Sequence, residues 1–274
     1  MEAFVCVTCG VQQPPSRRPP RRCQICSDQR QYVPESGQRW TTLGEMEGHF
    51  RNEITELEPD LFRIHTEPEF GIGQGALLVR TAQGNLLWDC VTHLDPETKE
   101  RVRQLGGLRA IAISHPHFYG SLVEWSGAFG EVPVYLSARD RRHLVRGGPS
   151  VVHFAGERIE PLPTLSLLRL GGHFDGSTVL HWPGGAQGRG VLLTGDTVAV
   201  VTDRRWVTFM YSYPNRIPLP AGDIERMARR LRRLPFDRIY GPWPKSRIST
   251  GAKRAVLRSA RRYQGMLAGT WPRD

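Results

Sequence analysis

The stretch LRAIAISHPHFYG (108–120) joins an apolar segment to two histidines. An apolar run ends at Ser114, and two histidines, His115 and His117, follow it one residue apart. Two imidazoles at positions i and i+2, just past the end of a strand, can converge on one metal ion. The pattern is therefore typical of a metal site, provided that other parts of the chain supply the missing ligands.

Two later segments offer such ligands. His173 lies in the glycine-rich loop of RLGGHFDGST (169–178), and Asp196 follows the apolar run of VLLTGDTVAV (191–200). Loops at the ends of strands on a rigid scaffold are where site residues gather. His115, His117, His173 and Asp196 are thus predicted to form a nitrogen-rich metal site with open positions. An aspartate after Thr-Gly can also cap a turn, and we expect only a turn role for Asp175.

A lone histidine beside an apolar strand is more often a hydrogen-bonded structural residue than a metal ligand. We give this structural interpretation to the other six histidines of the chain: His49, His65, His93, His143, His153 and His181.

Taken in order, SHPHFYG (114–120), GGHFDGS (171–177) and LLTGDT (192–197) resemble the motifs of the metallo-β-lactamase superfamily of metallo-hydrolases. The resemblance covers roughly residues 58–268. It implies an α/β fold, an αββα sandwich with the metal site along one edge of the two apposed sheets. The combination of this domain with an N-terminal zinc ribbon resembles stand-alone members of the superfamily.

The chain departs from the superfamily at three positions. The superfamily's first motif reads His-x-His-x-Asp-His, but here Tyr119 and Gly120 replace its last two residues, and Pro242 or Trp243 replaces a late histidine. In dinuclear members these positions help to hold the second metal. The resemblance therefore implies a mononuclear site with His115, His117, His173 and Asp196 as ligands. It also implies that Asp89 supports the site from outside the ligand set.

Such a site predicts a metal-dependent hydrolase acting on a small-molecule substrate. A zinc-bound hydroxide would attack an ester, thioester or phosphoester, with Asp196 in the catalytic set and amide cleavage the least expected reaction. Tyr119 is a tentative catalytic residue that either donates a hydrogen bond or only fills the volume of the missing second metal. The second hypothesis is a catalytically degenerate binding protein. The third is a mononuclear iron oxidoreductase, so the site ion is zinc or iron.

Four of the five cysteines form two pairs, CVTC (Cys6, Cys9) and CQIC (Cys23, Cys26), separated by 13 residues. Paired C-x-x-C motifs at this spacing favour a structural zinc site, a zinc ribbon, over a redox dithiol or two disulfides. Gly10 follows the first pair, where such a turn often needs a positive φ. The fifth cysteine, Cys90, is expected to be a small buried hydrophobic residue.

The sequence divides into a zinc ribbon (1–30), a connector packed on the main domain (31–57) and a metallo-β-lactamase-like domain (58–274). The connector contains a short helix around 43–49. Helices are predicted at 95–107 and 120–130 and twice in the C-terminal third, with short strands between them. The segment 204–220 is expected near the mouth of the site.

The net charge is +10, and from residue 223 onward 14 lysines and arginines face four acidic residues. The two basic helices there are interpreted as solvated faces, with nucleic-acid binding as the less favoured alternative. No run of apolar residues is long enough to span a membrane, and the N-terminus lacks the features of a signal peptide. The predicted location is therefore the cytoplasm, with no membrane partner.

Overall fold

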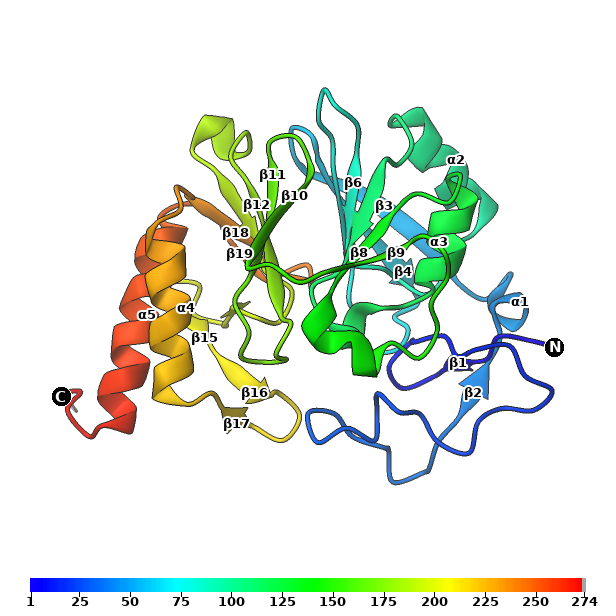
Figure 1. Cartoon of the computed structure of the whole chain (residues 1–274), viewed down its shortest axis with the longest axis horizontal. Coiled ribbons are helices and arrows are strands. Elements are labelled where there is room, and N and C mark those ends of the chain that lie inside the picture. The colour runs from blue at the N-terminus through cyan, green and yellow to red at the C-terminus, as the bar shows by residue number, and fades with distance from the viewer. Residues whose placement is uncertain (273–274) are drawn as a thin grey trace.

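Two β-sheets lie face to face, and helices cover their outer faces (Figure 1). The computed structural model describes residues 1–272. The seven-stranded sheet has the order β3-β4-β5-β6-β7-β8-β9, antiparallel from β3 to β6 and parallel from β6 to β9. Its strands are β3 (Arg51–Glu58), β4 (Leu61–Glu67), β5 (Ala76–Val79), β6 (Leu86–Trp88), β7 (Ala110–Ala112), β8 (Val134–Ser137) and β9 (Val151–Phe154).

The six-stranded sheet has the order β10-β11-β12-β13-β18-β19, with only the pair β13–β18 parallel. Its strands are β10 (Arg158–Leu162), β11 (Leu165–Arg169), β12 (Thr178–Trp182), β13 (Val191–Leu193), β18 (Arg238–Tyr240) and β19 (Arg247–Ile248). Every residue of β5, β6, β7, β12 and β13 is buried, because both faces of these strands are covered. This explains the uninterrupted apolar sequences of β5, β6, β7 and β13, whereas β12 also contains the buried polar residues Thr178 and His181.

The core has three layers. Leu77, Trp88 and Leu180 belong to the layer that joins the two sheets. A second layer packs the seven-stranded sheet against α2 (Pro96–Gln104) and α3 (Leu122–Ala128), and a third packs the six-stranded sheet against α4 (Ala221–Arg232) and α5 (Ala252–Leu267). The predicted αββα sandwich is confirmed.

Local signals set the limits of these helices. Asp95 accepts a hydrogen bond from the backbone N–H of Thr98 and so caps α2, with Pro96 at the first helical position, as predicted. The helix expected around 43–49 is the single turn α1 (Leu43–Met46), where Thr42 and Glu45 form a capping box.

The connector prediction missed a strand. Residues 51–58 form β3, which pairs with β4 along its whole length and is the edge of the seven-stranded sheet. The side chains of β3 are mostly polar, half of them are charged and half are exposed, so the segment lacks the apolar run that marks the other strands.

The remaining short elements lie around the sheet ends. They are β1 (Val5–Cys6) in the ribbon, which pairs with β2 (Trp40–Thr41) in the connector, the hairpins β14 (Ala199–Val200) with β15 (Val207–Thr208) and β16 (Met210–Ser212) with β17 (Ile217–Pro218), and the 3₁₀ turns η1 (Pro116–Phe118), η2 (Ala138–His143) and η3 (Ala186–Gly188). Within residues 1–272, no helix has the length and apolar character needed to cross a membrane.

Candidate metal centres

The first pair of histidines follows strand β7 of the seven-stranded sheet. His115 precedes the 3₁₀ turn η1 and His117 is its second residue, while Pro116 pre-sets the φ angle at the start of the turn. Both side chains are almost fully buried, with exposed fractions of 2%. The turn therefore holds two imidazoles at a fixed angle at the end of a rigid strand.

His173 and Asp196 come from the other sheet. His173 lies in the loop between β11 and β12, and Asp196 follows β13. Gly195 has a φ of +50°, and a Cβ atom there would lie 2.4 Å from the Ser114 hydroxyl oxygen. A side chain at this position would push the two sheet ends apart, so the glycine lets Asp196 approach the histidines.

The four predicted ligands converge. One donor atom from each of His115, His117, His173 and Asp196 lies within 4.8 Å of the other three. The His173 Nε2 is 3.3 Å from the His117 Nδ1, and the His115 Nε2 is 3.7 Å from the nearer Asp196 oxygen. Two donors about 2.1 Å from one tetrahedral ion lie about 3.4 Å apart. The spacing therefore fits a single metal ion at the centre of the four residues.

Unpaired polar atoms support this fit. The His115 Nε2 and the Asp196 Oδ1 are buried and have no hydrogen-bond partner. Buried polar atoms without partners are costly, and a bound ion is one of the few things that explains them.

A hydrogen-bonded chain orients His115. The Asp89 carboxylate accepts hydrogen bonds from the Ser114 backbone N–H (2.7 Å) and hydroxyl (2.8 Å), and that hydroxyl oxygen is 2.9 Å from the His115 Nδ1. Since the Ser114 proton goes to Asp89, the oxygen accepts from the His115 Nδ1–H. This leaves the Nε2 lone pair for a metal and places Asp89 where the sequence predicted it, outside the ligand set.

The segment 204–220 orients His173 in the same way. The His173 Nδ1 is 2.9 Å from the carbonyl oxygen of Tyr211 and 3.3 Å from that of Met210, so it donates a proton to strand β16. The Tyr213 hydroxyl donates to the backbone oxygen of Asp196 at 2.8 Å. Tyr213 was not predicted, because a tyrosine in an irregular segment carries no local signal.

Burial governs the protonation of the ligands. It lowers the pKa of His115 and His117 well below the usual value and that of His173 to about 4. It also raises the pKa of Asp196 to about 8, with a smaller contribution from the charge of Asp89. Neutral imidazoles are the form that binds metals, and a divalent ion would offset the cost of burying the Asp196 charge.

The residues that replace the superfamily's second-metal ligands contact other parts of the protein. Tyr119 lines a cavity of about 10 Å³ that also touches Val11 and Gln12 of the ribbon. Gly120 has a φ of +48°, and its carbonyl oxygen accepts a hydrogen bond from the Gln12 N–H. Trp243 packs against Phe118 and donates to the Ile72 carbonyl oxygen.

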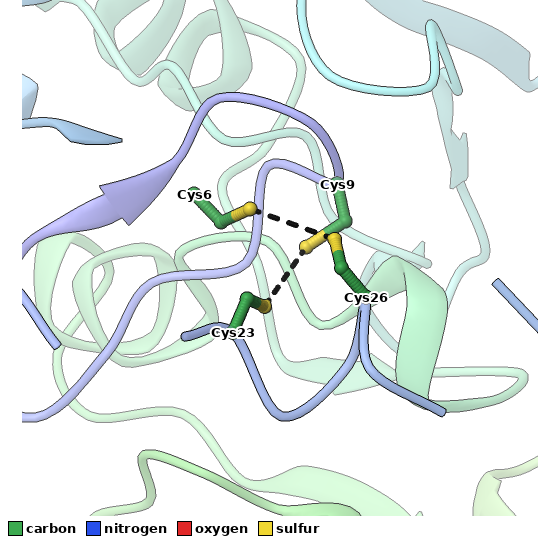
Figure 2. Close-up of side chains that lie close together, drawn as sticks. All are labelled: Cys6, Cys9, Cys23 and Cys26. Carbon is green, nitrogen blue, oxygen red and sulfur yellow. Dashed lines mark hydrogen bonds between the residues drawn. The ribbon is translucent and has the colours of Figure 1, made fainter. Parts of the chain in front are cut away.

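The four ribbon cysteines form a second cluster (Figure 2). The Sγ atoms of Cys6 and Cys26 are 3.6 Å apart and those of Cys9 and Cys23 are 3.7 Å apart, and all four thiols are free and buried. Sulfurs about 2.3 Å from one tetrahedral ion lie about 3.8 Å apart, so the cluster fits zinc. The φ of Gly10 is +76°, as predicted.

Three comparisons place the chain among known proteins. The family model described as the metallo-beta-lactamase superfamily matches residues 73–243. The uncharacterized protein YmaE of Bacillus subtilis (strain 168) is 46% identical over 265 residues, which is 96% of both chains.

Solved structures share the fold. TMB-1 has a TM-score of 0.58 at 14% identity, covering 77% of this chain and 98% of its own. A motif mutant of the metallo-beta-lactamase from Cronobacter sakazakii has a TM-score of 0.52 at 18% identity, covering 79% and 97%. The family model spans well over half of the residues, and together with the converging metal site this shows that the chain belongs to the metallo-β-lactamase superfamily.

Proposed function

We propose that this protein is a metal-dependent hydrolase with one ion held by His115, His117, His173 and Asp196, and that it acts on a small ester, thioester or phosphoester. The observation that carries the proposal is the convergence of four buried donors at ion-binding distances. A divalent ion there supplies the Lewis acidity that lowers the pKa of a water and polarises the substrate oxygen.

The assignment to one ion rests on the surroundings of the ligands. The Gly120 position offers no side chain, and its carbonyl oxygen is paired with the ribbon. Tyr119 lies against the ribbon, and Trp243 packs on Phe118, whose ring contacts His115 at 4.3 Å between centroids. These three positions therefore supply no carboxylate or imidazole ligand to a second ion, which favours a single one.

Other groups of the site accept a proton and exclude solvent. Asp196 has a buried, unpaired Oδ1 that can accept a proton from a water held at the site. The aromatic rings of Phe118, Phe174 and Tyr213 surround the histidines and exclude bulk solvent. Tyr119 stands where the superfamily motif has an aspartate, so we expect activated esters to be better substrates than amides.

A small-molecule substrate is favoured over nucleic acid. Part of the basic surface of α4 is already paired, since Arg226 contacts Asp223 and Arg230 contacts Glu157. On α5, Arg258 and Arg262 stack on the ring of Trp206. These arginines thus make intramolecular contacts, and their charges have a structural role in the protein.

Metal content and ester hydrolysis together test the proposal. The wild type is compared with the double variant His115→Ala/His173→Ala and with His49→Ala, which changes an exposed histidine. We expect two ions per chain in the wild type and in His49→Ala, and one in the double variant, with the ribbon zinc retained. Hydrolysis of p-nitrophenyl acetate and bis(p-nitrophenyl) phosphate is measured on the same samples.

The outcomes separate the hypotheses. Loss of turnover in the double variant alone supports the hydrolase, and the element found at the histidine site decides between zinc and iron. One ion per chain in all three proteins contradicts the proposal. Two ions without any hydrolysis in the wild type favours the degenerate binding protein.

A further inference from the structure

The ribbon reaches the histidine site through residues 28–31. Figure 1 shows the ribbon passing along the base of the molecule to the turn between β16 and β17. The Ser212 hydroxyl donates to the Arg30 carbonyl oxygen at 3.0 Å, and the Asn215 side chain donates to the Gln29 carbonyl oxygen at 3.0 Å. Because β16 also accepts the hydrogen bonds of His173, this part of the ribbon is attached directly to the wall of the metal site.

Arg30 brings a positive charge to this wall. Its guanidinium lies 4.3 Å from the ring centre of Phe174 and 4.8 Å from that of Tyr211, and the residue is 7% exposed. The Phe174 ring in turn contacts His117 at 4.9 Å and His173 at 5.2 Å between ring centroids. One aromatic side chain thus touches both the arginine and the metal ligands.

The side chain of Arg30 is only partly satisfied. Its Nη1 donates to both carboxylate oxygens of Asp28, at 2.7 and 2.8 Å. Its Nε is buried and has no partner, and the nearby Gln31 Oε1 is also buried without one. A buried guanidinium nitrogen with no acceptor carries a desolvation cost that an anionic ligand would remove.

We propose that Arg30 of the zinc ribbon is a substrate-recognition residue of the histidine site, and that the substrate carries an anionic oxygen group, a carboxylate or a phosphate, beside the bond that is cleaved. The cleavage of the substrate rests on the proposed function, whereas the recognition of the anionic group by Arg30 needs only a metal-loaded histidine site. It gives the ribbon a role at the site, in addition to its own zinc.

Two thiols that differ only in charge test the proposal. The thiolate of 3-mercaptopropionate and that of 3-mercapto-1-propanol both anchor on a metal ion, but only the first carries a carboxylate. Isothermal titration calorimetry of the metal-loaded protein gives the ratio of their dissociation constants. We expect the carboxylate to improve binding by about tenfold or more in the wild type, as for a charge-assisted hydrogen bond.

Three variants separate recognition from packing. In Arg30→Gln the ratio falls to about 1, because the charge is lost. In Asp28→Asn the ratio rises above the wild-type value, because Arg30 loses its competing partner while an amide oxygen still accepts from the Arg30 backbone N–H. Arg17→Gln changes an exposed arginine of the same ribbon and leaves the ratio unchanged. Two ions per chain in each variant shows that both metal sites are intact.

Each result decides the matter. Equal binding of the two thiols to the wild type overturns the proposal, as does failure of both thiols to bind. If Arg30 only docks the ribbon, Arg30→Gln and Asp28→Asn both weaken the two thiols equally, which also overturns it. Calorimetry needs no turnover, so a protein that discriminates the thiols without hydrolysing esters contradicts the proposed function and leaves the role of Arg30 standing.

Discussion

Ser114 links the buried Asp89 carboxylate to the predicted metal ligand His115 and so orients the His115 ring. Its hydroxyl donates to Asp89 and accepts from the His115 Nδ1. An imidazole with both nitrogens free can adopt either tautomer, whereas these two hydrogen bonds fix the proton of His115 on Nδ1.

We therefore expect Ser114→Ala to weaken metal binding at the histidine site by about 10- to 100-fold, the usual cost of losing a partner of a metal-bound histidine. Competition with a chromophoric chelator measures the affinity. Ser126→Ala removes another buried hydroxyl, which donates to the Val132 carbonyl oxygen away from the site, and it leaves the affinity unchanged. Equal affinities of Ser114→Ala and the wild type would show that the chain of hydrogen bonds has no role.

A second residue-scale prediction concerns His181, one of the histidines interpreted as structural. It is buried in β12, its Nε2 lies 2.7 Å from the Pro235 carbonyl oxygen, and burial lowers its pKa. Below the unfolded-state pKa of about 6.5 the unfolded chain binds a proton that the folded chain does not. The free energy of unfolding therefore falls as the pH drops below about 6.5.

The variant His181→Gln keeps an N–H donor for Pro235 but does not titrate. Urea unfolding at pH values of about 5 and 8 is expected to show a smaller loss of stability on acidification than in the wild type, where the slope attributable to His181 reaches at most about 1.4 kcal/mol per pH unit. The same loss in both proteins would assign the acid sensitivity to other groups.

Among the elements, β3 and β18 join the two sheets through buried hydrogen bonds. Glu58, at the end of β3, is buried and accepts hydrogen bonds from the Ala186 backbone N–H, the Tyr240 hydroxyl and the Arg238 guanidinium. Tyr240 and Arg238 belong to the opposite sheet. Burial and the Glu58 contact raise the pKa of Tyr240 to about 12, so its hydroxyl remains a donor.

Replacing this carboxylate removes the charge from a buried network. We expect Glu58→Gln to lower the free energy of unfolding by about 1–3 kcal/mol, since Arg238 loses its ionic partner and one donor loses its acceptor. Urea denaturation measures the change, and Glu56→Gln, an exposed residue of the same strand, serves as the control. A change as small as that of the control would mean that apolar packing alone joins the sheets.

At the scale of the whole molecule, the ribbon is a structural part of the hydrolase-like domain. Besides the contacts of residues 28–31, Gly10 accepts a hydrogen bond from the Thr92 hydroxyl at 2.7 Å, and Gln24 donates to the Arg142 carbonyl oxygen at 3.1 Å. The ribbon cysteines belong to the same core layer as β7 and α3. The Pro- and Arg-rich segment between the cysteine pairs supplies little core of its own, so we expect a bound metal ion to stabilise it.

Loss of the ribbon zinc should therefore loosen the wall of the histidine site. In Cys23→Ser we expect faster amide hydrogen exchange in residues 28–31 and 210–215, with exchange in the central strands β5 and β12 unchanged. Mass spectrometry of proteolytic fragments resolves these segments. Unchanged exchange in residues 210–215 would show that the ribbon and the histidine site are independent units.

The sequence predicted the site better than its surroundings. The three motifs named the four residues that converge, because ligands fixed at the ends of apolar strands leave a local pattern. Strand β3 was missed because an edge strand with a solvated face needs few apolar residues. Arg30, Phe174 and Tyr213 were missed because their roles arise from contacts between segments more than 100 residues apart along the chain, or from irregular loops.

Residue type and spacing within single segments were enough to predict the family, the αββα sandwich, the two clusters of candidate metal ligands and the start of α2. The contact of the ribbon with the histidine site, and the orientation of the ligands by Ser114 and β16, are seen only in the folded protein. These features depend on which surfaces meet when the chain packs. Packing is set by the burial of apolar area over the whole molecule, and no single segment encodes it.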